Sequence, residues 1–145
     1  MLGFDPLLAT TEKRAVTQPA REIVLVVDDE EMVRKLAARM LAGQGYKILE
    51  ASGGDVAVRM LQRDAHRIDA VLTDLAMPGL GGRGLGETIS RCWPRVRVIY
   101  MSGFQGNRMI NEGQLDPDKP FVQKPFTVEE LSRKVREVLG RPPQE

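Results

Sequence analysis

Short apolar runs alternate along this chain with segments in which apolar residues recur at helical spacing, and this alternation leaves few possible folds. The runs are rich in β-branched residues and lie at 23–27, 46–51, 70–74, 96–101 and 121–124. Continuous apolar runs are typical of strands that helices cover on both faces. Five strand–helix units in sequence therefore predict an α/β fold, a doubly wound, five-stranded parallel sheet with about five helices.

The segments between the runs carry the helical signals, at about 32–41, 55–64, 85–92, 127–139 and, more weakly, 107–112. The first of them has two neighbouring rows of apolar residues at helical spacing, which are Met32, Leu36 and Met40 and, beside them, Val33, Ala37 and Leu41. Gly43 and Gly45 then end the helix. The last helix begins at a capping box, in which Thr127 is followed three residues later by Glu130.

The length of 145 residues fits one domain, and the charge gives no sign of a nucleic-acid partner, since 21 Lys and Arg balance 20 Asp and Glu. The apolar runs are too short to span a bilayer, and the N-terminus lacks the pattern of a signal peptide. The single cysteine, Cys92, rules out an intrachain disulfide, and we expect it in or beside the core. We expect a cytoplasmic domain at 22–139, with a flexible tail or linker at 1–21 and a C-terminal tail at 140–145.

Polar residues stand where four of the five predicted strands end. They are Asp28 and Asp29 after the first strand, Asp74 on the third, Ser102 after the fourth and Lys124 on the fifth. Because parallel strands direct their carboxyl ends to one edge of the sheet, we expect these side chains to converge. Each has an ordinary interpretation when taken singly, such as an acid that stabilises a helix N-terminus. Their joint occurrence at four strand ends favours a site.

A cluster of carboxylates restricts the chemistry of such a site. Crowded carboxylates repel one another, so a cation is expected among them. Oxygen ligands without histidine or cysteine suit Mg²⁺ rather than zinc or copper. With Mg²⁺ bound, one carboxylate is able to attack phosphorus, while Lys124 neutralises the transferring group and Ser102 hydrogen-bonds it.

Four stretches of the sequence together resemble the receiver domain of two-component response regulators, over about 22–139. They are IVLVVDDE at 23–30, DLAMPG at 74–79, YMSG at 100–103 and KPF at 124–126. The resemblance implies a flavodoxin-like sheet with the strand order 2-1-3-4-5. The stretch 100–126, with YMSGF at its start and FVQKPF at its end, is similar to the C-terminal receivers of hybrid histidine kinases.

The resemblance implies a role for each residue of the acidic cluster. Asp74 would accept the phosphoryl group, and Lys124 would pair with that group or, before phosphorylation, with Asp74 itself. Mg²⁺ would be bound by Asp29 directly, by Asp28 through water, by Asp74 and by the backbone carbonyl of Ala76.

The resemblance also implies how the domain switches and what it binds. Ser102 would be the switch hydroxyl that moves toward the phosphoryl oxygens, Phe121 would be the switch aromatic residue, and the bond before Pro125 would be cis. The donor would be a phosphohistidine on a sensor histidine kinase or a histidine phosphotransfer protein. Such a domain would be no conventional enzyme, would bind neither nucleic acid nor membrane through this segment, and would be a monomer or weak homodimer.

Some features of the sequence leave other interpretations open. An aspartate-nucleophile, Mg²⁺-dependent phosphatase would carry an acid where this chain has Ala76, and a degenerate receiver that only binds proteins would not need the complete set of site residues. Ala76 and Phe104 stand at two positions that tune phosphate lifetime in the family, and their apolar side chains predict slow hydrolysis. The glycines of 79–84 fit a dinucleotide-binding pattern but lack its downstream acid, so we interpret them as a flexible loop beside Asp74.

Overall fold

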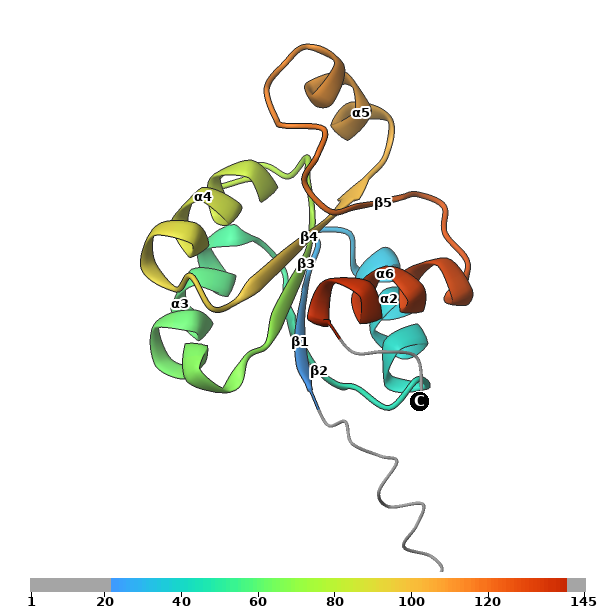
Figure 1. Ribbon diagram of the computed structural model, residues 1–145. Coiled ribbons are helices and arrows are strands. Elements are labelled where there is room, and N and C mark those ends of the chain that lie inside the picture. Colours follow the sequence, from blue (N-terminus) through green and yellow to red (C-terminus); the bar gives the residue numbers. More distant parts are fainter. Residues whose placement is uncertain (1–21, 141–145) are drawn as a thin grey trace, which may run out of the picture.

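The computed structural model describes residues 22–140. Its strands are β1 (Ile23–Val27), β2 (Lys47–Ala51), β3 (Ala70–Asp74), β4 (Arg97–Ser102) and β5 (Phe121–Gln123). They form one parallel sheet in the order β2-β1-β3-β4-β5, which confirms the predicted doubly wound topology (Figure 1). The expected tail or linker at 1–21, and all but the first residue of the tail at 140–145, lie outside the described residues.

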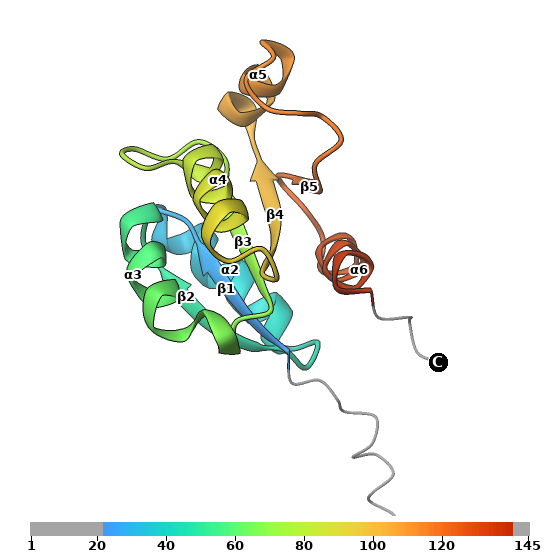
Figure 2. The ribbon, with the colours of Figure 1, turned by 60° about the vertical axis from the view of Figure 1, so that its left-hand side comes forward.

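Helices follow each of these strands within the described range. They are α2 (Glu31–Ala42), α3 (Gly54–Asp64), α4 (Gly82–Cys92), α5 (Phe104–Asn111) and α6 (Val128–Leu139), with a 3-10 turn, η1 (Ala65–Arg67), after α3. One face of the sheet is covered by α2 and α6 and the other by α3 and α4, while α5 stands apart beyond the carboxyl ends of the strands (Figures 1 and 2). None of the helices between residues 22 and 140 has both the length and the apolar character needed to cross a membrane.

Successive residues of the central strand β1 enter two different cores. Val24 and Val26 pack with the apolar residues of α2 and α6, whereas Leu25 and Val27 pack with those of α3 and α4. All four side chains are fully buried. Burial of each contributes about 1.5–3 kcal/mol, which explains why this strand reads as a continuous apolar run rather than an alternating one.

Helix α2 forms where the sequence predicts it, and of its two apolar rows the one that contains Ala37 and Leu41 faces the core. Met32 and Leu36 are 85% and 50% exposed, whereas Ala37 and Leu41 are fully buried against the sheet. The two rows of apolar residues are neighbours on the helix surface, so spacing alone does not tell which one meets the core. The helix ends at Gly43, as predicted.

The glycines of 79–84 are not a loop throughout, because the loop ends at Gly81 and α4 begins at Gly82. A Cβ atom on Gly82 would overlap the carbonyl oxygen of Asp74 and lie 2.7 Å from the Cα of Leu75. A residue without a side chain is thus required where α4 crosses the end of β3. The interpretation of this run as a flexible loop is wrong in its second half, where the glycines allow close packing.

Helix α5 begins earlier than the sequence predicts, whereas α6 begins where it is predicted. The sequence predicts a helix at 107–112, whereas α5 begins at Phe104, directly after its N-cap residue Gly103, because the segment has too few apolar residues to mark a boundary. The capping box of α6 is confirmed. The Thr127 hydroxyl accepts the Glu130 N–H at 3.0 Å, and the Glu130 carboxylate accepts the Thr127 N–H at 2.9 Å.

The expectation that Cys92 lies in or beside the core is wrong. Cys92 is the last residue of α4, and its side chain is exposed. The buried side chains of this helix are Leu85 and Ile89, one turn apart, and Cys92 lies beyond them at the exposed helix end.

Candidate functional site

Three carboxylates meet at the carboxyl edge of the sheet. Strands β1 and β3 are parallel neighbours in which Val27 pairs with Thr73. The next residue after each of these two, Asp28 and Asp74, therefore comes side by side with the other. One oxygen from each of Asp28, Asp29 and Asp74 lies within 4.8 Å of the others. The structure thus brings together the three acids that the sequence singles out.

The Asp28 side chain is fully buried, and Asp28 is hydrogen-bonded to the N-cap residue of α2 and to the first turn of that helix. Its Oδ1 accepts the Glu30 N–H at 2.9 Å, and its backbone carbonyl accepts a guanidinium N–H of Arg34 at 2.9 Å. Arg34 is itself fixed by an ion pair of 2.9 Å with Glu50 of β2. Arg34 therefore supports the acidic cluster, a role that its sequence position does not reveal.

Lys124, directly after β5, supplies the positive charge of the site. Its Nζ lies 3.2 Å from Oδ1 of Asp74 and 3.3 Å from Oδ2 of Asp28. Its backbone N–H donates to the Ser102 carbonyl at 2.9 Å, which continues the pairing of β5 with β4. The peptide bond between Lys124 and Pro125 is cis. The ammonium is thus held between two buried carboxylates by the backbone of an edge strand.

Burial and charge together set the protonation of this pair. Burial is the main cause that raises the pKa of Asp74 to about 6, and the Asp28 and Asp29 carboxylates add to the rise while Lys124 opposes it. Burial by itself lowers the pKa of Lys124, but the Asp74 and Asp28 carboxylates together raise it above its ordinary value. Lys124 therefore stays charged at neutral pH, and Asp74 loses its proton close to neutrality.

A cavity of about 360 Å³ opens over these groups to the solvent. Asp29, Asp74, Ala76 and Lys124 line it on the sheet side, and the start of α5 lines the other side. Ala76 is thus placed beside the acids. Gln105 also lines the cavity, and nothing in the sequence pattern singles it out, because its place depends on where α5 begins.

Ser102 ends β4 and is almost fully buried, with 1% of its surface exposed. Its hydroxyl donates a hydrogen bond of 2.7 Å to Oδ1 of Asn107 in α5. The hydroxyl is thus directed at α5 rather than at the carboxylates of the cluster. Asn107 lies outside the set of site residues that the sequence predicts.

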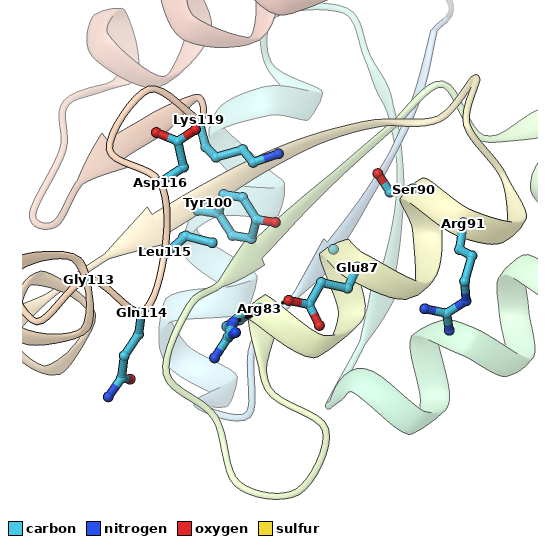
Figure 3. A pocket seen from close by; sticks show the side chains of 11 residues that line it. Arg83, Glu87, Ser90, Arg91, Tyr100, Gly113, Gln114, Leu115, Asp116 and Lys119 are labelled. Atoms are coloured by element: carbon cyan, nitrogen blue, oxygen red, sulfur yellow. Dashed lines mark hydrogen bonds and ion pairs between the residues drawn. The ribbon is translucent and has the colours of Figure 1, made fainter.

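Phe121 lies on β5 and packs against Tyr100 of β4, with the ring centres 5.6 Å apart and the planes inclined by 36°. Tyr100 points from the strand toward α4, into a second cavity of about 530 Å³ that the segment 113–119 closes on its far side (Figure 3). None of the acids of the cluster lines this second cavity. The second cavity therefore lies between α4 and the segment after α5, and it shares no lining residue with the first.

Comparison with known proteins agrees with this geometry. Residues 24–136 match the family described as response regulator receiver domain. The chain is 29% identical over 140 residues to the sensor kinase CckA of Brucella abortus (strain 2308), a match that covers 94% of this chain and 15% of that protein. The chain covers 15% of the length of the first curated relative that it matches and 46% of the second, so it spans less than half of either.

Solved structures share the fold. The receiver domain of the hybrid histidine kinase CckA superposes with a TM-score of 0.66 at 29% identity, covering 81% of this chain and 98% of that one. A response regulator receiver domain protein from Clostridium thermocellum superposes with a TM-score of 0.74 at 25% identity, covering 82% and 94%. With a family match over most of its length and relatives among hybrid kinase receivers, this chain belongs to the response regulator receiver domain family.

Proposed function

We propose that this domain accepts a phosphoryl group onto Asp74 from a phosphohistidine, with the help of Mg²⁺, and passes the signal on by a change of conformation. The observation that carries the proposal is the position of the Lys124 ammonium, 3.2 Å from Asp74 and 3.3 Å from Asp28, at the floor of an open cavity. A buried carboxylate with a cation beside it and access from solvent is the arrangement that an acceptor of a phosphoryl group needs.

The donor set fits Mg²⁺. Three carboxylates offer oxygens within 4.8 Å of one another, and among the described residues neither histidine nor cysteine belongs to the cluster. Asp29, Asp74 and the carbonyl of Ala76 would bind the ion, with Asp28 bound through water. When bound, Mg²⁺ supplies positive charge for the equatorial oxygens of the transferring phosphoryl group.

The residues of the chain carry the remaining steps. A carboxylate oxygen of Asp74 attacks phosphorus, the new bond is Oδ–P, and the P–N bond to the donor histidine breaks, leaving a neutral imidazole once it takes up a proton. With its pKa near 6, Asp74 is mostly ionised at neutral pH and so available as a nucleophile. Lys124 then transfers its ion pair from the carboxylate to the phosphoryl oxygens.

The switch and the partner belong to the same proposal. Ser102 turns toward the phosphoryl group, and Phe121, which packs on Tyr100, moves with it. The donor is a sensor histidine kinase or a histidine phosphotransfer protein in the cytoplasm, and the domain, 22–139, acts there as a monomer or weak homodimer without nucleic acid. It promotes only its own phosphorylation and dephosphorylation and turns over no other substrate.

Exposed apolar side chains around the cavity support a protein as the donor. Phe104 lines the cavity and is 78% exposed. Met32 and Leu36, on the helix that begins one residue after Glu30 of the cavity rim, are 85% and 50% exposed. Apolar residues beside a charged cavity suit the helix that carries the donor histidine, because they would exclude water around the transfer.

Phosphoramidate provides the test, because it carries the P–N bond of phosphohistidine without a protein. We expect mass spectrometry to find one phosphoryl group on the wild type with Mg²⁺, and none on Asp74→Asn or with EDTA. A phosphoryl group that persists in Asp74→Asn would contradict the assignment. Continuous release of phosphate from added phosphate esters would instead identify a phosphatase.

A further inference from the structure

The hydroxyl proposed as the switch is already engaged in the structure. Ser102 Oγ donates to Asn107 Oδ1 at 2.7 Å, a short and well-formed bond between the end of β4 and the first turns of α5. The bond is shielded, because Ser102 is 1% exposed. A serine hydroxyl has a single proton to donate, so this proton serves Asn107 as long as the bond persists.

Helix α5 rests on the site through very few residues. Gly106 is its one buried residue, and a Cβ atom there would lie 2.9 Å from Ser102 Oγ and 3.3 Å from Cδ2 of Leu75, the residue after Asp74. The rest of the helix stands away from the four other described helices (Figure 2). The bond from Ser102 to Asn107 is therefore a large part of what fixes α5 relative to the acidic cluster.

We propose that Asn107 is a positioning residue that holds the Ser102 hydroxyl on α5 while Asp74 is unphosphorylated. This inference rests on the proposed function, in which Ser102 donates to a phosphoryl oxygen on Asp74. Asn107 and the phosphoryl group then compete for one proton. Phosphorylation breaks the bond to Asn107, and breaking that bond loosens α5.

The competition explains how the state of Asp74 reaches the surface. Once released, α5 loses its polar contact with β4 and is held mainly by Gly106. The helix leads into the segment 113–119, which borders Tyr100 and the second cavity (Figure 3). A change at α5 therefore alters a surface that lies outside the acidic site.

The test measures the affinity of Asp74 for beryllofluoride, a mimic of the phosphoryl group, by calorimetry with Mg²⁺ present. Asn107→Ala removes the competing acceptor, so we expect beryllofluoride to bind two- to tenfold more tightly than to the wild type. Asn111→Ala is the matched control, because Asn111 is an exposed asparagine of the same helix. It should leave the affinity unchanged.

A double-mutant cycle with Ser102→Ala separates positioning from a merely structural role. Without the hydroxyl there is nothing to compete for, so Asn107→Ala should have no effect on affinity in the Ser102→Ala background. Hydrogen exchange should also show residues 104–111 opening when beryllofluoride binds the wild type, and already open in free Asn107→Ala.

The outcomes also separate this inference from the proposed function. If the wild type binds no beryllofluoride, or Asp74→Asn binds it equally well, the proposed function fails. If Asp74 is required but Asn107→Ala binds as the wild type does, only the positioning role is overturned. The positioning role is also overturned if Asn107→Ala changes the affinity for beryllofluoride by the same factor with and without the Ser102 hydroxyl.

Discussion

The Lys124 ammonium lies 3.2 Å from a carboxylate oxygen of Asp74, although the two residues come from strands that do not touch. Asp74 ends β3, Lys124 follows β5, and β4 runs between them. A long side chain must therefore reach across one strand to pair with the carboxylate. The contact depends on the parallel order of three strands, and it makes the pair a direct target for experiment.

Removal of this cation should slow phosphorylation of Asp74. Lys124 lowers the pKa of Asp74, so Lys124→Ala should raise that pKa above about 6 and reduce the ionised fraction of the nucleophile. It also removes a group that neutralises the transferring phosphoryl group, a loss of roughly 100-fold in rate. Mass spectrometry of the reaction with acetyl phosphate measures the rate, and Lys119→Ala, an exposed lysine, is the control. An unchanged rate would mean that Lys124 has only a structural role.

The charge on buried Asp74 should make the metal-free domain less stable at neutral pH. The pKa of Asp74 is raised from 3.8 to about 6, so the folded state holds a proton that the unfolded state releases between these values. The contribution of this proton to the free energy of unfolding is thus complete below pH 3.8 and is lost by about pH 6. Asp74→Asn should therefore be more stable than the wild type at pH 7, by at most about 3 kcal/mol.

Urea unfolding in EDTA at a series of pH values measures this difference. The advantage of Asp74→Asn should shrink as the pH falls from about 6 to 3.8. An advantage that is independent of pH would exclude the charge of Asp74 as its cause.

Mg²⁺ should stabilise the fold through the acidic cluster. An ion that binds only the folded protein adds about 2.7 kcal/mol at a concentration 100 times its dissociation constant. Asp29→Asn removes the exposed carboxylate of the cluster and should abolish most of the rise in melting temperature with Mg²⁺. Asp55→Asn, at an exposed acid in the first turn of α3, should leave the rise intact. Equal rises in both variants would place the ion elsewhere.

Gly86 should be required for the packing of α4 on β4. A Cβ atom there would overlap the Tyr100 hydroxyl and approach the ring carbon that bears it. Gly86→Ala should therefore cost about 1–3 kcal/mol in the free energy of unfolding. Tyr100→Phe removes the overlapping oxygen, so the double variant should regain part of that loss in a urea titration. No regain would show that the strain lies in the backbone of α4.

Much of the fold follows from patterns that are local in the sequence. The apolar runs predict five strands within one or two residues, and the capping box of Thr127 and Glu130 predicts the start of α6. The glycines after α2 predict its end. These signals depend on neighbours in the chain, whose geometry is set by the helix and strand periods.

The sequence alone determined which residues stand at strand ends, Asp28, Asp74 and Lys124 among them. It also determined that they meet, because the parallel order brings the residues at strand ends to one edge of the sheet. Only the tertiary structure decided which apolar row of α2 is buried, why Gly82 must lack a side chain, and that Ser102 bonds to Asn107. These facts depend on the distance between elements far apart in the chain. No local period encodes that distance, which is fixed only when the helices pack against the sheet.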